Sequence, residues 1–195
     1  MNYQKTGDGV FVAKKLNDID EIDAIIFDCD GVLVDVSKSY DLTIKKTTQY
    51  VLKKFANMKS IPITAKIIGG FKSTGGFNDE VDITYASILS LLAAKKLGLN
   101  DTKFIFRVIK NADSTGIESV EKFLDTFGVD LLDIRKKLDY PGEHATNPLY
   151  KIFDQIFYGP TLYKQIFKKK SQFTDRTGRV FWVPGTERRW QNHHH

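Results

Sequence analysis

The sequence contains a single cysteine, Cys29, and no apolar run that approaches the roughly 18 residues of a membrane-spanning helix. A single cysteine cannot form a disulfide within the chain, which fits a reducing compartment. We expect Cys29 to be a small, buried side chain rather than a reactive thiol. The polar amino terminus lacks the pattern of a signal peptide. These absences predict a soluble, cytoplasmic protein that makes no contact with membranes.

Arginine is scarce over most of the chain. All 23 lysines precede Ser171, whereas four of the six arginines and both tryptophans lie in the last 25 residues. So abrupt a change in composition predicts that residues 171–195 are a non-native tail, derived from vector sequence or from an altered reading frame. The terminal residues His193 to His195 then read as the remnant of a tag rather than as a metal site. The alternative is a natural protein with a genuinely different end.

The positive charge of the chain is modest. The sequence holds 29 basic and 24 acidic residues, a net charge of +5, and the excess falls to +3 without the predicted tail. The lysines are spread along the sequence, and no basic stripe with interleaved aromatic residues marks a surface for a phosphate backbone. The sequence therefore predicts no nucleic-acid partner.

Two aspartates, Asp28 and Asp30, follow directly on the apolar run from Ala24 to Phe27. The run predicts a short buried strand, and because successive side chains of a strand point to opposite faces, Asp28 and Asp30 would project together. Gly31 supplies the backbone freedom for a tight turn just past the strand, where carboxylates can meet a phosphate and a divalent metal. This pattern is typical of a phosphoryl-transfer site, with an ordinary acidic turn as the alternative.

The same segment resembles the nucleophile motif of the haloacid dehalogenase (HAD) superfamily. With the following residues Val36 to Tyr40 it is similar to an archaeal-type subfamily of HAD phosphatase-like proteins, and Gly75-Gly76-Phe77-Asn78 is similar to a segment in the cap domain of that subfamily. The resemblance covers about residues 20 to 165. It implies an α/β HAD-like (Rossmannoid) fold, of which this chain would be mostly α, with a helical cap domain and the first core strand.

The resemblance implies the chemistry of a magnesium-dependent phosphatase that acts on a small phosphomonoester. Asp28 would be the nucleophile that takes the phosphoryl group as an aspartyl-phosphate. Asp30 would protonate the leaving oxygen and then activate the water that cleaves the intermediate. Mg²⁺ would bind the Asp28 carboxylate and the Asp30 backbone carbonyl, offsetting the repulsion between these acids and an anionic substrate.

The glycine-rich cap loop is the candidate for substrate selection. In this interpretation Asn78, Asp79 and Asp82 would hydrogen-bond a polar organic phosphate. Phe77 would pack beside the substrate, and Gly31 would contact it from the nucleophile loop. A competing interpretation assigns the same residues to folding, with Asn78 as a helix cap and Phe77 as the side chain that staples the helix to its neighbour.

Three other parts of a HAD site are not found after the helical region: a strand ending in Ser or Thr, a catalytic lysine, and an acidic pair. Thr177-Gly178-Arg179 resembles the phosphate-holding sequence of the subfamily, but the preceding sequence, Phe173 to Arg176, does not predict a buried strand. Two interpretations stay open, a phosphatase and a catalytically incomplete cap module that folds or self-associates without turnover. We favour phosphatase activity for the parent protein and incompleteness for this chain. Phosphoryl transfer depends almost entirely on charge stabilisation, and the missing lysine and acidic pair are groups that would supply it.

The predicted organisation has four segments. They are the first part of the core with the nucleophile loop (1–35), the helical cap (36–158), a return toward the core (159–170) and the tail (171–195). Apolar periodicity predicts helices over 37–57, 79–96, 102–111, 117–127, 131–138 and 148–158, and a glycine-rich loop over 69–76.

Two further expectations follow from this organisation. The nucleophile strand lacks neighbouring strands, which predicts that it pairs with another chain in a homo-oligomer or is displaced from its family position. His144 is alone in a loop rich in Pro, Gly and Asn, and we expect it to be an exposed loop histidine.

Overall fold

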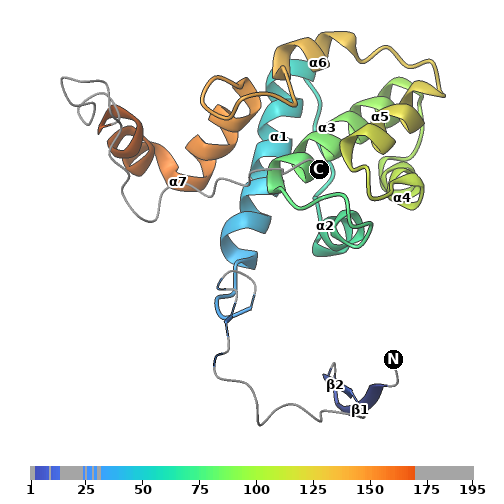
Figure 1. Ribbon diagram of the computed structural model, residues 1–195. Helices are drawn as coiled ribbons and strands as arrows, with labels where there is room; N and C mark the ends of the chain where they lie inside the picture. The colour runs from blue at the N-terminus through green and yellow to red at the C-terminus, as the bar shows by residue number, and fades with distance from the viewer. Residues whose placement is uncertain are drawn as a thin grey trace, which may run out of the picture. The chain divides into compact units, whose positions relative to one another are not determined.

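The structure is a computed structural model that describes residues 3–8, 10–13, 24, 26, 27, 29 and 32–169. It is mostly helical, as the sequence predicts, and the chain divides into two compact units between Val36 and Ser37 (Figure 1). Among the described residues, no helix is long and apolar enough to cross a membrane.

A β-hairpin in the amino-terminal unit was not predicted. Strands β1 (Tyr3–Gly7) and β2 (Val10–Ala13) pair antiparallel, with Tyr3 opposite Ala13 and an irregularity in register between Lys5 and Gly7. The signal for this hairpin is the Gly-Asp-Gly sequence that follows Thr6, because glycine and aspartate favour the tight turns that join two strands.

The predicted buried strand over Ala24 to Phe27 is wrong for the residues that the structure describes. Ala24, Ile26 and Phe27 lie in no regular element, and Ile26 is 96% exposed. Cys29 is also exposed, contrary to our expectation. An apolar run becomes a buried strand only where neighbouring strands supply backbone partners and a covered face, and within the described chain β1 and β2 pair only with each other.

The helical unit begins with a π-helical turn, η2 (Ser37–Asp41), that leads into α1 (Leu42–Ala56). The predicted helix over 37–57 is thus confirmed in extent. At this junction the Thr43 hydroxyl donates to the Ser39 carbonyl over 2.8 Å. Asn57 ends α1 in the left-handed conformation at φ 47°.

Helix α2 (Ala65–Lys72) corrects the prediction of a loop from Gly69 to Gly76. Thr64 caps it, since the Thr64 hydroxyl accepts a hydrogen bond from the Ile67 N–H over 3.4 Å. At Gly70 a Cβ atom would lie 3.1 Å from the side chain of Ile109 in α4 (Asp101–Asn111). The glycine therefore belongs to a close contact between two helices, which outweighs its unfavourable helix propensity.

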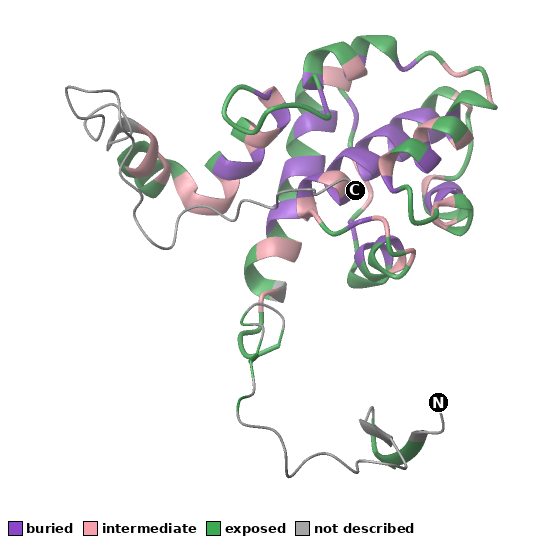
Figure 2. Cartoon of the chain, viewed as in Figure 1, coloured by how far each residue is buried: buried purple, intermediate pink, exposed green. Residues whose placement is uncertain are grey.

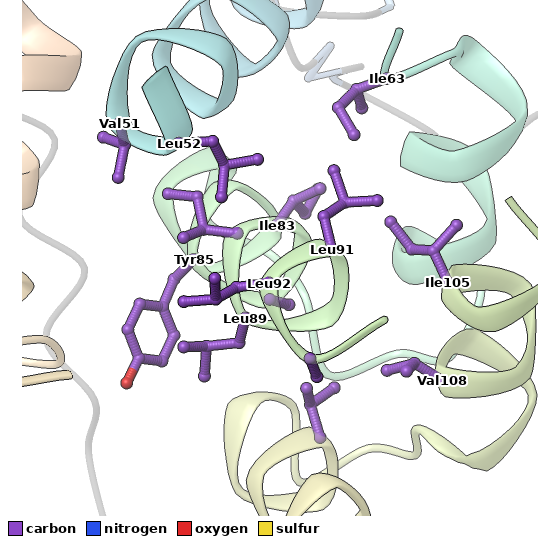
Figure 3. Close-up of a cluster of buried hydrophobic side chains, with 14 of the residues drawn as sticks. Val51, Leu52, Ile63, Ile83, Tyr85, Leu89, Leu91, Leu92, Ile105 and Val108 are labelled. Atoms are coloured by element: carbon purple, nitrogen blue, oxygen red, sulfur yellow. The ribbon is translucent and has the colours of Figure 1, made fainter. Parts of the chain in front are cut away.

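Helix α3 (Glu80–Lys96) forms the centre of the core, and 13 of its 17 residues are buried. Helices α1, α2, α4, α5 (Ile117–Asp125) and α7 (Pro148–Lys169) all pack against it (Figures 1 and 2). The side chains of Ile83, Leu89 and Leu91 point outward from it into these neighbours (Figure 3). The sequence predicted a helix that is apolar on most sides and hence buried, and this is confirmed.

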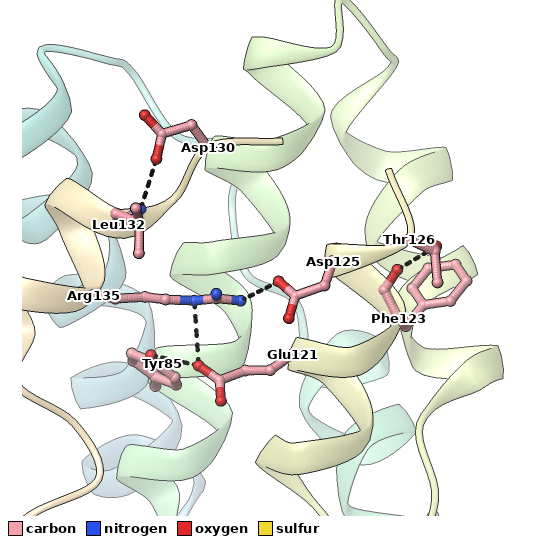
Figure 4. Close-up of polar contacts among 8 residues, drawn as sticks. All are labelled: Tyr85, Glu121, Phe123, Asp125, Thr126, Asp130, Leu132 and Arg135. Atoms are coloured by element: carbon pink, nitrogen blue, oxygen red, sulfur yellow. Dashed lines mark hydrogen bonds and ion pairs between the residues drawn. The ribbon is translucent and has the colours of Figure 1, made fainter. Parts of the chain in front are cut away.

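A polar network joins α3, α5 and α6 (Leu132–Leu138) at the edge of this core (Figure 4). The Tyr85 hydroxyl donates to the Glu121 carboxylate over 2.9 Å. The Arg135 guanidinium lies 3.3 Å from Glu121 and 2.9 Å from Asp125. Because Arg135 and Glu121 are partly buried, one guanidinium fixes how the two helices lie against α3.

Helix α7 consists of two helical segments, and the first of them ends at residue 158, as predicted. Asn147 caps its start, since the Asn147 side-chain oxygen accepts from the N–H groups of Leu149 and Tyr150 over 2.8 and 3.2 Å. Gly159 breaks the helix at φ 72°, and Pro160 begins a second helical segment that reaches Lys169. Proline is tolerated in the first turn of a helix, where its missing N–H is not needed, so the Gly-Pro pair ends one helical segment and begins the next.

Candidate functional site

The predicted cap loop is held by close backbone packing. A Cβ atom at Gly76 would collide with the Asp113 carbonyl and the Gly116 backbone, and Gly75 has a left-handed φ of 83°. A side chain larger than hydrogen at Gly76 would separate the two loops. These glycines thus have a structural requirement that is independent of any ligand.

Phe77, Asn78 and Asp79 face different surroundings. Phe77 is 1% exposed and packs on Phe71, with ring centroids 4.9 Å apart, whereas Asn78 is exposed. Asp79 caps α3, since its Oδ1 accepts from the Val81 N–H over 2.7 Å, and its Oδ2 accepts from the Tyr150 hydroxyl over 2.8 Å. Of the residues in this part of the chain that were predicted to contact substrate, Phe77, Asn78, Asp79 and Asp82, only Asn78 is exposed.

Asp82, one helical turn further along α3, is bound by a second tyrosine. The Tyr140 hydroxyl donates to the Asp82 Oδ1 over 2.5 Å, and the Tyr140 ring lies 5.0 Å from Tyr85 and 5.5 Å from Tyr150. Two tyrosine hydroxyls thus donate hydrogen bonds to two carboxylates at the start of α3. We call this group of Asp79, Asp82, Tyr140 and Tyr150 the acid–tyrosine cluster.

Burial perturbs the proton equilibria of the cluster. It raises the pKa of Asp82 from 3.8 to about 6, an effect that the nearby charges of Asp79 and Glu80 reinforce and that the hydrogen bond from Tyr140 partly opposes. Burial and the neighbouring carboxylates also raise the pKa of Tyr140 and of Tyr150. Both phenols therefore stay protonated at neutral pH and act as hydrogen-bond donors to the carboxylates.

Replacing Asp82 with asparagine is expected to stabilise the helical unit above pH 6. A carboxyl group whose pKa is raised on folding favours the folded state while it is protonated, so its contribution is lost as the pH rises from about 4 through about 6. A difference of about two pH units corresponds to about 3 kcal/mol. Urea unfolding between about pH 4 and pH 8 measures the free energy of unfolding of both proteins. The free energy of unfolding of the variant should increase relative to that of the wild type as the pH rises.

The control for this measurement is Gln49→Ala at an exposed position of α1, which leaves every titratable group of the chain in place. Its pH profile should run parallel to that of the wild type. Parallel profiles for Asp82→Asn as well would show that the Asp82 carboxyl does not titrate differently in the folded and unfolded chains.

His144 contacts two side chains of α7, which its place in the sequence did not indicate. Its Nε2 lies 3.0 Å from the Oδ2 of Asp154, and its ring meets the Tyr150 ring edge-on at a centroid distance of 4.5 Å. The His144 side chain is 54% exposed and the residue lies in the loop before α7, so the expectation of an exposed loop histidine is confirmed. The contact ties the loop before α7 to α7 itself and to the acid–tyrosine cluster.

The predicted catalytic and metal-binding residues Asp28 and Asp30, and Gly31 beside them, lie outside the described residues. What the structure describes nearby is a tight turn, in which the Cys29 carbonyl accepts from the N–H groups of Leu33 and Val34, each over 2.9 Å.

Among the described residues, no group of three or more His, Cys, Asp or Glu side chains could hold a metal ion. The carboxylates of Asp28 and Asp30 are hard oxygen donors of the kind that Mg²⁺ prefers.

Comparison with known proteins identifies no relative. No family model matches the chain, and no curated protein and no solved structure is significantly similar to it. A functional assignment has to come from the residues themselves.

Proposed function

We propose that this protein is a HAD-type hydrolase, a magnesium-dependent phosphatase that acts on a small phosphomonoester. The observation that carries the proposal is the aspartate motif, in which Asp28 and Asp30 flank one residue after an apolar run and Gly31 follows. The helical unit that begins at Ser37, directly after the motif, supports it, because the family inserts a helical cap at this point of the chain.

The first half of the proposed reaction transfers the phosphoryl group to the protein. An oxygen of Asp28 attacks phosphorus, the bond to the substrate oxygen breaks, and Asp30 donates a proton to that leaving oxygen. When bound, Mg²⁺ supplies positive charge that offsets the repulsion between the carboxylates and the phosphate.

The second half regenerates the protein. Asp30, now a carboxylate, takes a proton from a water molecule, and the resulting hydroxide attacks the phosphorus of the aspartyl-phosphate. The bond between phosphorus and the Asp28 oxygen breaks, so inorganic phosphate leaves and both aspartates return to their starting protonation states. Splitting one displacement into two in this way lowers the barrier of each.

Removal of Mg²⁺ is expected to abolish phosphate release. We would assay a panel of small phosphate esters with the full chain, in Mg²⁺ and in excess EDTA, and expect turnover in Mg²⁺ that falls to the level of an Asp28→Asn control in EDTA and returns when Mg²⁺ is restored. Release that persists in EDTA, or in the Asp28→Asn variant, would contradict the proposal. No release from any ester would favour the alternative of a module that folds without turnover.

The specificity of the cap is proposed to lie with Asn78. Asp79 is already occupied by the α3 backbone and by Tyr150, so its part would be to fix the loop that carries Asn78. Asn78 offers an exposed amide that can donate to a phosphate or hydroxyl oxygen of the substrate.

A further inference from the structure

An apolar groove lies between α1 and α7. The two helices pack together, and at one end Tyr40 and Phe157 stack with ring centroids 4.8 Å apart. The groove has a volume of about 440 Å³. Its lining includes Tyr50 from α1 and, from α7, Ile152, Ile156, Pro160, Tyr163 and Lys164.

The kink in α7 falls within this lining. Pro160 contributes to the groove, Ile152 and Ile156 come from the segment before the kink, and Tyr163 comes from the segment after it. Ile152, Ile156 and Tyr163 are each partly exposed, and Tyr50 is 44% exposed. In the helical unit, apolar side chains from both helices therefore remain accessible to a partner.

The net positive charge of the helical unit is concentrated on the same two helices. Residues 42–56 and 148–169 together hold eight lysines and one acidic residue, Asp154. The other residues between 37 and 169 hold 13 basic and 13 acidic side chains, which cancel. The sequence led us to expect lysines spread without a cluster, but α1 and α7, more than 90 residues apart in the chain, contact each other, and eight lysines belong to these two helices.

The rim of the groove presents ammonium groups without an exposed carboxylate from either helix. The Lys54 Nζ lies 3.0 Å from the Tyr50 hydroxyl and 5.3 Å above the Tyr50 ring, and Lys164 is exposed at the opposite wall. Asp154, the one acidic residue of the two helices, is buried against His144. The two helices that line the groove therefore carry a net positive charge, which favours an acidic partner.

We propose that this groove binds an acidic amphipathic helix of a partner protein. An apolar groove of this kind accepts side chains spaced three or four residues apart on one face of a helix, and glutamates or aspartates on the flanking faces would meet the lysine rim. Aromatic side chains such as Tyr50 and Tyr163 are typical anchors of such interfaces.

Other anionic partners fit the surface less well. The floor of the groove is concave and apolar, which suits inserted side chains better than a phosphate backbone. A flat lipid surface would contact the helix ridges rather than the floor. Arginine, the side chain that best forms paired hydrogen bonds with phosphate, is absent from both helices.

The test uses the full chain and a fluorescein-labelled synthetic helix with leucine at positions i, i+3 and i+7 and glutamate on its other faces. A peptide with lysine in place of glutamate is its control. Fluorescence anisotropy should show binding of the glutamate peptide only, and the affinity should fall as the salt concentration rises.

Charge reversal locates the binding surface. The double variant Lys54→Glu with Lys164→Glu should weaken binding about tenfold or more. Lys103→Glu with Lys110→Glu changes the net charge equally at exposed positions of α4 and should leave the affinity within about twofold. Ile156→Asp should also weaken binding, and circular dichroism establishes that each variant is folded.

Three results would overturn the inference: no binding of the glutamate peptide, equal binding of the glutamate and lysine peptides, or equal losses in the groove and α4 variants. Binding of a single-stranded oligonucleotide or of phosphatidylserine vesicles that depends on Lys54 and Lys164, without binding of the peptide, would assign the surface to nucleic acid or to membranes instead.

Discussion

Replacement of Asp30 by asparagine is expected to lower the rate of phosphate release about 100- to 10,000-fold. Asparagine keeps the size of the side chain and the backbone carbonyl that would bind Mg²⁺, but it can neither donate the proton to the leaving oxygen nor accept one from water. The measurement is kcat for an alkyl phosphate, with Asp41→Asn in η2 as a matched loss of one carboxylate outside the motif.

The dependence on the leaving group makes this prediction specific. An alkoxide needs a proton as it departs, whereas a nitrophenolate is stable as an anion, so phosphoryl transfer from 4-nitrophenyl phosphate needs the general acid much less. Asp30→Asn should therefore slow formation of the phosphorylated enzyme far more for the alkyl ester than for the aryl ester. Equal losses for both esters would show that Asp30 does not protonate the leaving group.

Truncation of Phe71 to alanine is expected to lower the free energy of unfolding of the helical unit by about 3–5 kcal/mol. Phe71 is fully buried and packs on Phe77, so the truncation removes buried apolar surface and leaves a cavity between α2 and the loop that leads to α3. Urea unfolding followed by far-UV circular dichroism measures the loss, with Leu132→Ala as a control.

Leu132 is 61% exposed, and its truncation should change the free energy of unfolding by less than about 0.5 kcal/mol. A loss for Phe71→Ala as small as that for Leu132→Ala would mean that α2 and the glycine-rich loop do not belong to the cooperative core. The same pair of variants thus tests whether Phe77 has a structural task, as its burial indicates, rather than a place beside a substrate.

The sequence predicted the central part of the fold because one helix there carries an unambiguous pattern. The run from Ile83 to Ala94 is apolar on nearly every side, and Asp79 and Gly98 provide a cap and a stop, so both the existence and the burial of α3 could be predicted. The helices that follow carry clear apolar periodicity between short connections, which made their bounds predictable as well.

Elements that depend on tertiary contacts could not be predicted in this way. Gly69 and Gly70 indicate a loop, yet α2 passes through them because Gly70 packs against Ile109. The Gly159–Pro160 pair indicates a helix end, and the first segment of α7 does end there, but the second segment from Pro160 to Lys169 was not predicted. An isolated apolar run from Ala24 to Phe27 indicates a buried strand, but burial depends on partners that the local sequence does not specify.

The candidate site likewise contains residues that the local sequence predicts and residues that only the fold brings together. Asp28 and Asp30 are neighbours in sequence, so their joint use could be predicted from spacing alone. The acid–tyrosine cluster joins Asp82 to Tyr140, which lies 58 residues further along the chain, and Asp79 to Tyr150, which lies 71 residues further along. Nothing in a single sequence pairs these residues, so the engagement of Asp79 and the raised pKa of Asp82 emerge only from the fold.

The proposed nucleophile can be tested most directly by trapping the phosphorylated protein. The full chain would be incubated with acetyl phosphate and Mg²⁺ and its peptides analysed by mass spectrometry, with Asp28→Asn and an EDTA sample as controls. The proposal predicts a hydroxylamine-sensitive phosphoryl group on Asp28 that is missing from both controls. A chain that stays unmodified, or one modified equally in the Asp28→Asn variant, would contradict it.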